Sequence, residues 1–371
     1  MKFSELSTAI RPILDTGHSI ELVSSPGLGK SEFVQQVVDD QSAKDGQPWG
    51  IATMFLATQT PPDLVGYIFK GERKYGEMTV PVSESAMPGW MFTDKGLPVV
   101  AHDRGILFLD EYGQGEPDVK RASAELLLNR KLGPWRLPKG WSVIAASNRT
   151  KDRSGVTKSF DFVINRRVEV HIDPDLDSWM DYAVRNKVNP VIQTFAKQNV
   201  GMVFSGEIPK EQGPWCTPRS LVKCGEVLDA LGRTHSSKGA AGDFARIPTG
   251  PVAQEIARGW LGDAAAMQLI NMIRLAYEAP TFEDIVADPT GIPVPVKPDI
   301  NMLVMYNLAS RVSEETCENV IAFMSRMGKE YATVFMQMTL RRLPMLLRTS
   351  PGMRKFVMDN KTMIAGLGAQ T

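Results

Sequence analysis

The chain has 371 residues, of which 43% are hydrophobic and 23% are charged, values typical of a folded globular protein with two or three domains. Lys plus Arg and Asp plus Glu each number 42, and this zero net charge argues against a broadly basic protein that binds nucleic acid or an anionic membrane. The three widely spaced cysteines imply no disulfide framework, and the sequence has neither a signal peptide nor an apolar run that could span a bilayer, so we expect a cytoplasmic protein.

The first half of the chain alternates short apolar strands with helices. The apolar runs predict strands at 18–23, 51–57, 106–109, 142–146 and 167–172. Helical spacing predicts helices at 4–14, 32–40, 61–68 and 118–130. Short, mostly apolar strands separated by helices are typical of a buried parallel sheet. The predicted fold class is therefore α/β, a five-stranded parallel sheet flanked by helices, over residues 1–175.

The second half of the chain contains no further strand signals and is predicted to be helical. The helices are expected at 177–186, 190–198, 218–231, 252–261, 264–277, 300–312, 314–343 with breaks, and 353–363. A Ser/Gly/Ala-rich stretch at 235–242 indicates a loop, and four prolines between 289 and 298 indicate an extended linker. We therefore expect an all-α domain at 176–285, a Pro-rich linker at 286–298 and a helical C-terminal extension at 299–371.

The loop SSPGLGKS at 24–31 joins the first predicted strand to a helix. Glycines in such a loop let the backbone approach a ligand closely, and N–H groups of the loop and of the helix N-terminus bind phosphate. In this pattern Lys30 would reach the β- and γ-phosphates and the Ser31 hydroxyl would ligate Mg²⁺. Ser24 stands at the first glycine of the pattern, so the match depends on its strand–loop–helix context. The predicted nucleotide-binding residues are Ser25, Pro26, Gly27, Leu28, Gly29, Lys30, Ser31 and Glu32.

Polar side chains follow two later strands at the points where the strands end. Asp110 and Glu111 follow the apolar run at 106–109, and Asn148 follows the run at 142–146. The carboxyl ends of parallel strands line the crevice where α/β sheets bind ligands. We therefore expect Asp110 to hold Mg²⁺ and Glu111 to polarise an attacking water. Asn148 is expected to hydrogen-bond that water or the γ-phosphate.

Taken in this order, these motifs resemble those of the AAA+ ATPases, and more narrowly the MoxR branch with its CbbQ- and NorQ-type proteins. Four further segments carry the resemblance: 60–67 with its Asp-Leu-x-Gly, a candidate hairpin at 71–82, a second hairpin within 126–148, and the Thr-Pro-Arg of 216–221. The resemblance covers residues 20 to 280. It implies an AAA+ core followed by a helical lid.

The resemblance also implies roles for single residues. Asn148 matches the first sensor, and Arg219 matches the second sensor that reports on the γ-phosphate. Arg166 falls at the arginine finger, the residue that a neighbouring subunit inserts into the nucleotide site. Arg167 follows where the family usually has an aromatic or apolar residue, so the choice between the two arginines stays open.

These resemblances imply ATP as substrate, Mg²⁺ as cofactor and a homo-oligomeric, usually hexameric ring. Hydrolysis between subunits would then remodel a partner protein, which the resemblance suggests carries a von Willebrand factor A domain. Two other functions remain open: an AAA+ NTPase linked to nucleic acid, and a nucleotide-gated scaffold with little turnover. The preference for ATP over GTP depends on the resemblance alone.

The C-terminal helices are rich in methionine and arginine. Methionines and aromatic residues recur at helical spacing in 323–338, which indicates a helical core or an adaptable surface for a partner. A basic cluster follows, for which a solvated face is the simplest interpretation: Arg341, Arg342, Arg348, Arg354 and Lys355.

Overall fold

The computed structural model describes residues 1–152, 155–157, 161–235 and 247–360, and the chain forms two compact units. The first unit comprises Met1–Pro174 with Gly206–Ile208, and the second comprises Asp175–Ser205 with Pro209–Thr371. Nearly all of the loop predicted at 235–242, and the end of the last predicted helix at 361–363, lie outside the described residues.

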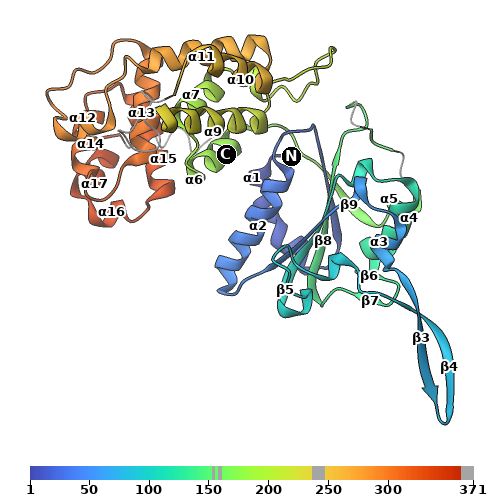
Figure 1. Ribbon diagram of the computed structural model, residues 1–371. Coiled ribbons are helices and arrows are strands. Elements are labelled where there is room, and N and C mark those ends of the chain that lie inside the picture. The colour runs from blue at the N-terminus through green and yellow to red at the C-terminus, as the bar shows by residue number, and fades with distance from the viewer. Residues whose placement is uncertain (153–154, 158–160, 236–246, 361–371) are drawn as a thin grey trace. The chain divides into compact units, whose positions relative to one another are not determined.

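The first unit contains all of the described strands and the helices that pack on them (Figure 1). In chain order its elements are α1 (Phe3–Asp15), β1 (Ser19–Ser24), α2 (Lys30–Asp45), β2 (Gly50–Phe55), η1 (Leu56–Thr58), α3 (Pro61–Val65), β3 (Ile68–Tyr75), β4 (Met78–Ser85), η2 (Gly89–Met91), η3 (Val99–Ala101), β5 (Arg104–Asp110), η4 (Tyr112–Gln114), α4 (Pro117–Asn129), β6 (Lys131–Leu132), β7 (Trp135–Arg136), β8 (Gly140–Asn148), α5 (Asp161–Ile164) and β9 (Arg167–His171).

Five parallel strands form the central sheet in the order β2-β5-β8-β1-β9. The predicted α/β fold, a five-stranded parallel sheet flanked by helices, is confirmed. The register pairs Ser24 at the end of β1 with Asn148 at the end of β8, and Phe55 with Asp110 at the ends of β2 and β5. The polar residues that follow the apolar runs therefore reach the same edge of the sheet.

Alternation along the strands divides the apolar side chains between two cores, one on each face of the sheet. Ile20 and Leu22 of β1 pack with residues of α1 and α2. Leu107 and Leu109 of β5 pack with residues of α3 and α4. These two helices lie on the opposite side of the sheet from α1 and α2 (Figure 1). Fully burying one such side chain stabilises the fold by roughly 1.5–3 kcal/mol, so the pattern fixes which face each strand presents.

A long hairpin, β3–β4, projects away from the sheet (Figure 1). Its two-residue turn begins at Gly76, whose φ of 62° suits the left-handed turns that join hairpin strands. It contains the predicted hairpin at 71–82 and extends beyond it at both ends. The short β6–β7 hairpin lies within the second predicted hairpin region, before β8.

The described residues of the second unit form helices joined by loops, with no strand among them. Its helices are α6 (Leu176–Arg185), α7 (Pro190–Gln198), α8 (Val200–Val203), α9 (Pro218–His235), α10 (Pro251–Leu261), α11 (Asp263–Ala276), α12 (Phe282–Ala287), α13 (Pro298–Arg311), α14 (Cys317–Met324), α15 (Lys329–Arg342), α16 (Leu346–Thr349) and α17 (Pro351–Asp359). None of the described helices combines the length and apolar composition needed to cross a bilayer.

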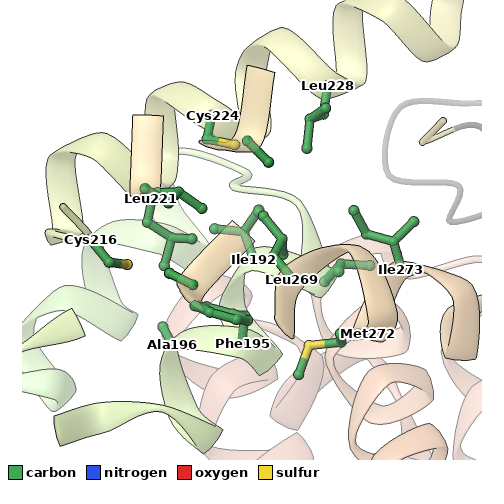
Figure 2. Packing of buried hydrophobic residues seen from close by; sticks show 14 of the residues in the cluster. Ile192, Phe195, Ala196, Cys216, Leu221, Cys224, Leu228, Leu269, Met272 and Ile273 are labelled. Atoms are coloured by element: carbon green, nitrogen blue, oxygen red, sulfur yellow. The ribbon is translucent and has the colours of Figure 1, made fainter. Parts of the chain in front are cut away.

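Two hydrophobic clusters hold the second unit together. The first gathers side chains of α7, α9, α10 and α11, among them Phe195, Leu221 and Leu269 (Figure 2). The second cluster is built mainly from α12 to α17. Two residues cross between the groups of helices: Val184 of α6 belongs to the second cluster, and Leu303 of α13 belongs to the first. The helices on both sides of the Pro-rich segment therefore share their cores.

Methionines in the C-terminal helices fill the second cluster. The buried set is Met305, Met324, Met327, Met336, Met338 and Met353. Of the arginine cluster, Arg341 pairs with Asp181 and the partly buried Arg342 donates to the carbonyl of Val312. Of the two interpretations of 323–338, the packing favours the helical core.

Candidate functional site

The loop between β1 and α2 turns through two glycines in the left-handed region. Gly27 has a φ of 79° and Gly29 a φ of 92°, and α2 begins at the next residue, Lys30. A Cβ at Gly29 would meet only the Glu32 carboxylate, at 3.8 Å, so the dihedral angle rather than space requires glycine there. A loop of this conformation turns successive backbone N–H groups toward one concave side, which suits an anion.

Lys30 opens α2 directly after this loop and is 8% exposed. Its Nζ donates to Ser24 Oγ and to Asn148 Oδ1, each at 3.0 Å, and to the Ser25 carbonyl at 3.4 Å. Ser24, at the position where the phosphate-loop pattern has its first glycine, thus supplies a hydroxyl acceptor to the lysine. The ends of β1 and β8 meet at a single ammonium group.

Ser31, the residue after Lys30, meets Asp110 at the end of β5. The Ser31 hydroxyl donates to Asp110 Oδ2 at 2.8 Å, although the two residues are 79 positions apart. A hydroxyl and a carboxylate oxygen at this spacing fit the oxygen ligands that Mg²⁺ prefers, and Mg²⁺ in nucleotide sites commonly takes only one or two protein ligands besides phosphate and water. The donor set therefore suits the predicted Mg²⁺ site.

Glu111 follows Asp110 in a left-handed conformation, with φ 51° and ψ 34°. Its N–H donates to Asp110 Oδ1 at 2.9 Å, and its side chain is exposed. A non-glycine residue in this region costs about 1–3 kcal/mol, and such strain concentrates at functional positions. The exposed Glu111 carboxylate, one residue beyond the end of β5, is accessible to water.

The two candidate arginines of 165–172 have different surroundings. Arg167 is 3% exposed and forms an ion pair with Glu21, which is 5% exposed and also accepts a hydrogen bond from Ser147. Its guanidinium lies 5.2 Å from the centre of the Tyr112 ring. Arg166 is half-buried and donates to the carbonyl of Ala124 at 3.1 Å. The buried pair gives Arg167 a structural role, so the arginine-finger prediction stays with Arg166.

Arg219 lies in the second unit, exposed in the first turn of α9. The start of α9 is fixed by a reciprocal pair of hydrogen bonds, in which Thr217 N donates to Ser220 Oγ at 2.8 Å and Ser220 N donates to Thr217 Oγ1 at 3.1 Å. The chain thus presents this arginine at a helix N-terminus. Its role as a second sensor stays a prediction.

Several polar residues around the site were not predicted from the sequence. They are Glu21, Lys120, Arg149, Asp152 and Thr157. Glu21 could have been noticed, because a carboxylate inside the buried strand SIELVS requires a cationic partner. Arg149 binds the buried Asp152 through two nitrogens and also the carbonyl of Gly206, a contact between distant segments for which the sequence gives no signal.

Comparison with known proteins gives matches at the level of structure only. No protein-family model matches the chain, and no curated protein matches it. A Cytophaga hutchinsonii protein described as a candidate ATPase is 15% identical, with a TM-score of 0.33 over 73% of this chain and 89% of its own.

Two further solved structures are similar to the chain at the same low level. RuvB of Thermotoga maritima is 11% identical, with a TM-score of 0.38 over 72% of this chain and 68% of its own. NtrX of Brucella abortus in complex with ATP is 15% identical, with a TM-score of 0.32 over 99% of this chain and 67% of its own. These similarities are too low to assign a function, which must come from the site itself.

Proposed function

We propose that the chain is a Mg²⁺-dependent ATPase of the AAA+ type, with the MoxR branch as its nearest resemblance. The observation that carries the proposal is the meeting of Lys30, Ser31, Asp110 and Asn148 at the carboxyl edge of the sheet, beside a glycine loop that opens a helix. Each of these side chains has the chemistry that phosphoryl transfer requires. Lys30 and Ser31 open α2, Asp110 ends β5 and Asn148 ends β8.

Each residue of the site has a separate role in the proposed hydrolysis. The loop N–H groups and Lys30 hold the β- and γ-phosphates. Ser31 and Asp110 hold Mg²⁺, which when bound neutralises charge on the phosphate oxygens. Glu111 orients a water and accepts its proton as the water oxygen bonds to the γ-phosphorus; the bond from that phosphorus to the β–γ bridging oxygen breaks and ADP leaves. Asn148 donates to the water or to the γ-phosphate.

The proposal includes a site shared between subunits of a homo-oligomeric ring, most often a hexamer in the resembling family. Arg166 is the residue proposed to reach the neighbouring subunit's phosphate, and Arg219 the one proposed to report on it from the lid. Movement of the second unit would then remodel a partner protein, for which a von Willebrand factor A domain is the class that the resemblance suggests.

A dilution series of ATP turnover tests the shared site. Specific activity of the wild type should fall steeply below the concentration at which the ring dissociates, because an arginine finger supplied by a neighbour is worth about 10³–10⁵ in rate. Arg166→Ala should bind ATP but turn over slowly at every concentration. Arg136→Ala, which removes an exposed arginine of β7, is the matched control. Specific activity that stays constant on dilution would contradict a shared site.

A further inference from the structure

Lys120 is a lysine of α4 whose side chain is wholly buried. Its Nζ donates three hydrogen bonds: to the carbonyl of Gly113 at 2.7 Å, to the carbonyl of Thr157 at 2.8 Å and to Thr157 Oγ1 at 2.7 Å. An ammonium group has three donors, so each of them is used. Lysine is among the residues least often fully buried, and here three oxygen acceptors surround its ammonium.

The three acceptors belong to two segments that flank the candidate catalytic residues. Gly113 lies in η4, two residues after the strained Glu111, and Thr157 lies in the segment that leads from Asn148 toward Arg166. The same segments also bind each other directly: Thr157 N donates to the Gly113 carbonyl at 2.9 Å, and Thr157 Oγ1 donates to the Gly115 carbonyl at 2.9 Å. Lys120 and Thr157 together clamp the turn that carries Glu111.

We propose that Lys120 is a positioning residue for ATP hydrolysis, whose ammonium holds the Glu111 turn in its left-handed conformation by tying Gly113 to Thr157. The inference rests on the proposed function. A strained backbone persists only where surrounding contacts over-determine it, and these contacts supply that restraint. Lys120 itself lies outside the phosphate loop and bonds to neither Ser31 nor Asp110 among the described contacts.

The clamp depends on the protonation state of the amine. A neutral amine has two donors and a lone pair. Among the three oxygen acceptors around Lys120, that lone pair would face an acceptor oxygen. The charged groups nearest to Lys120 come from other elements: Glu21 of β1 and Arg167 of β9, with Tyr112 of η4 presenting its ring at 5.9 Å from the ammonium. The pKa of Lys120 is lowered to about 8: burial is the largest cause, the Glu21 carboxylate opposes it, and the Arg167 guanidinium adds to the lowering.

Activity and stability should therefore respond to alkaline pH in opposite directions. As pH rises through about 8 the folded chain loses the ammonium, and kcat should fall while ATP affinity stays unchanged. In the unfolded chain the lysine titrates near its ordinary value of about 10.4, so between these limits the unfolded state binds more protons. The contribution of Lys120 to the free energy of unfolding thus rises across the window in which kcat falls.

The test measures kcat, the KM for ATP and direct ATP binding from pH 6.5 to 9.5 in four proteins: wild type, Lys120→Met, Thr157→Val and the exposed-lysine control Lys95→Met. Lys120→Met should lower kcat roughly 10- to 100-fold, the size of effect that a small misplacement of a catalytic group produces. Its ATP affinity should stay within about 2-fold, since none of the described hydrogen bonds of Lys120 reaches a phosphate-loop residue. The fall of kcat near pH 8 should be absent from this variant.

Thr157→Val keeps the side-chain shape and removes one acceptor of the ammonium. In Thr157→Val, the pH at which kcat falls on the alkaline side should be lower than in the wild type. If Thr157 had only a structural role, the variant would lose stability but its kcat would fall at the wild-type pH. If Lys120→Met does not fold, the pH dependence of kcat in Thr157→Val tests the inference instead. An alkaline limb that is the same in wild type and Thr157→Val, or a folded Lys120→Met with wild-type kcat, would overturn the inference. A wild type that binds ATP without hydrolysing it at any pH would instead overturn the proposed function.

Discussion

At the scale of single residues, the buried pair of Glu21 and Arg167 is the contact whose loss should cost most. Both side chains are about 95% removed from water, so an unpaired partner would be a buried, uncompensated charge. Arg167→Ala should therefore lower the free energy of unfolding by about 3–5 kcal/mol, measured by denaturant unfolding.

A surface pair of the same chemistry provides the control for this prediction. Arg73 and Glu84 pair at 3.5 Å on the β3–β4 hairpin, with side chains 64% and 34% exposed. Arg73→Ala should change the free energy of unfolding by about 0–1 kcal/mol because water screens the pair. If Arg167→Ala were as mild, Arg167 would not be a structural residue and would become a candidate arginine finger again.

The sequence could predict the residues of the site that stand at strand ends. Asp110 and Asn148 each follow an apolar run, and parallel strands bring such positions to one edge. Lys30 could be predicted from the glycine loop that joins β1 to α2. Lys120 could not be predicted in this way, because its acceptors are 7 and 37 positions away along the chain. Its burial depends on packing between α4 and two loops, which no local pattern reports.

At the scale of elements, the five strands of the sheet lie within two residues of the predicted ranges. The helix predicted at 32–40 runs on to Asp45, and the one predicted at 61–68 ends at Val65. The helix predicted at 190–198 has those bounds in the structure, since Asn189 caps it and Pro190 opens it. The helix α12 (Phe282–Ala287) was missed because its six residues carry little periodic signal before the prolines. Hairpin β3–β4 was predicted only from a resemblance, and its strands run further than expected.

The base of that hairpin depends on a glycine with no room for a side chain. Gly66 has a φ of 93°, and a Cβ there would lie 1.9 Å from the carbonyl oxygen of Ala86. Gly66→Ala therefore adds a backbone clash to a left-handed strain of about 1–2 kcal/mol. We expect the hairpin base to open and residues 67–86 to become sensitive to limited proteolysis.

Gly76 at the hairpin tip is the matched control for this change. Its φ of 62° is also left-handed, but a Cβ there would meet nothing within 4 Å. Gly76→Ala should carry the strain alone and leave the hairpin base protected. Equal sensitivity of the two variants would show that the contact with Ala86 does not hold the hairpin.

At the scale of the whole molecule, the helices of the second unit share two hydrophobic clusters across the predicted domain boundary. Leu303, within the predicted C-terminal extension, is fully buried in the first cluster of the second unit, and Val184 of α6 is buried in the second cluster. Removal of 299–371 would expose both clusters to water. We expect the truncated chain to aggregate, while Met358→Ala, at a side chain 72% exposed, should leave it soluble.

Size-exclusion chromatography and circular dichroism of the truncated chain measure this outcome. A soluble truncation with a cooperative unfolding transition and wild-type turnover would contradict it. The extension would then be an appended docking module rather than part of the core.

The central claim, that the edge of the sheet is a hydrolytic ATP site, is tested most directly by Glu111→Gln. The substitution keeps the size of the side chain and removes the group that accepts the proton from water. The measurement is ATP binding and ATP turnover, with Mg²⁺, in the variant and in the wild type at the same protein concentration. We predict turnover by the wild type, and in Glu111→Gln a turnover roughly 10²–10⁴-fold lower with ATP affinity within about 2-fold. A variant that hydrolyses ATP at the wild-type rate, or a wild type that binds no ATP, would contradict the account.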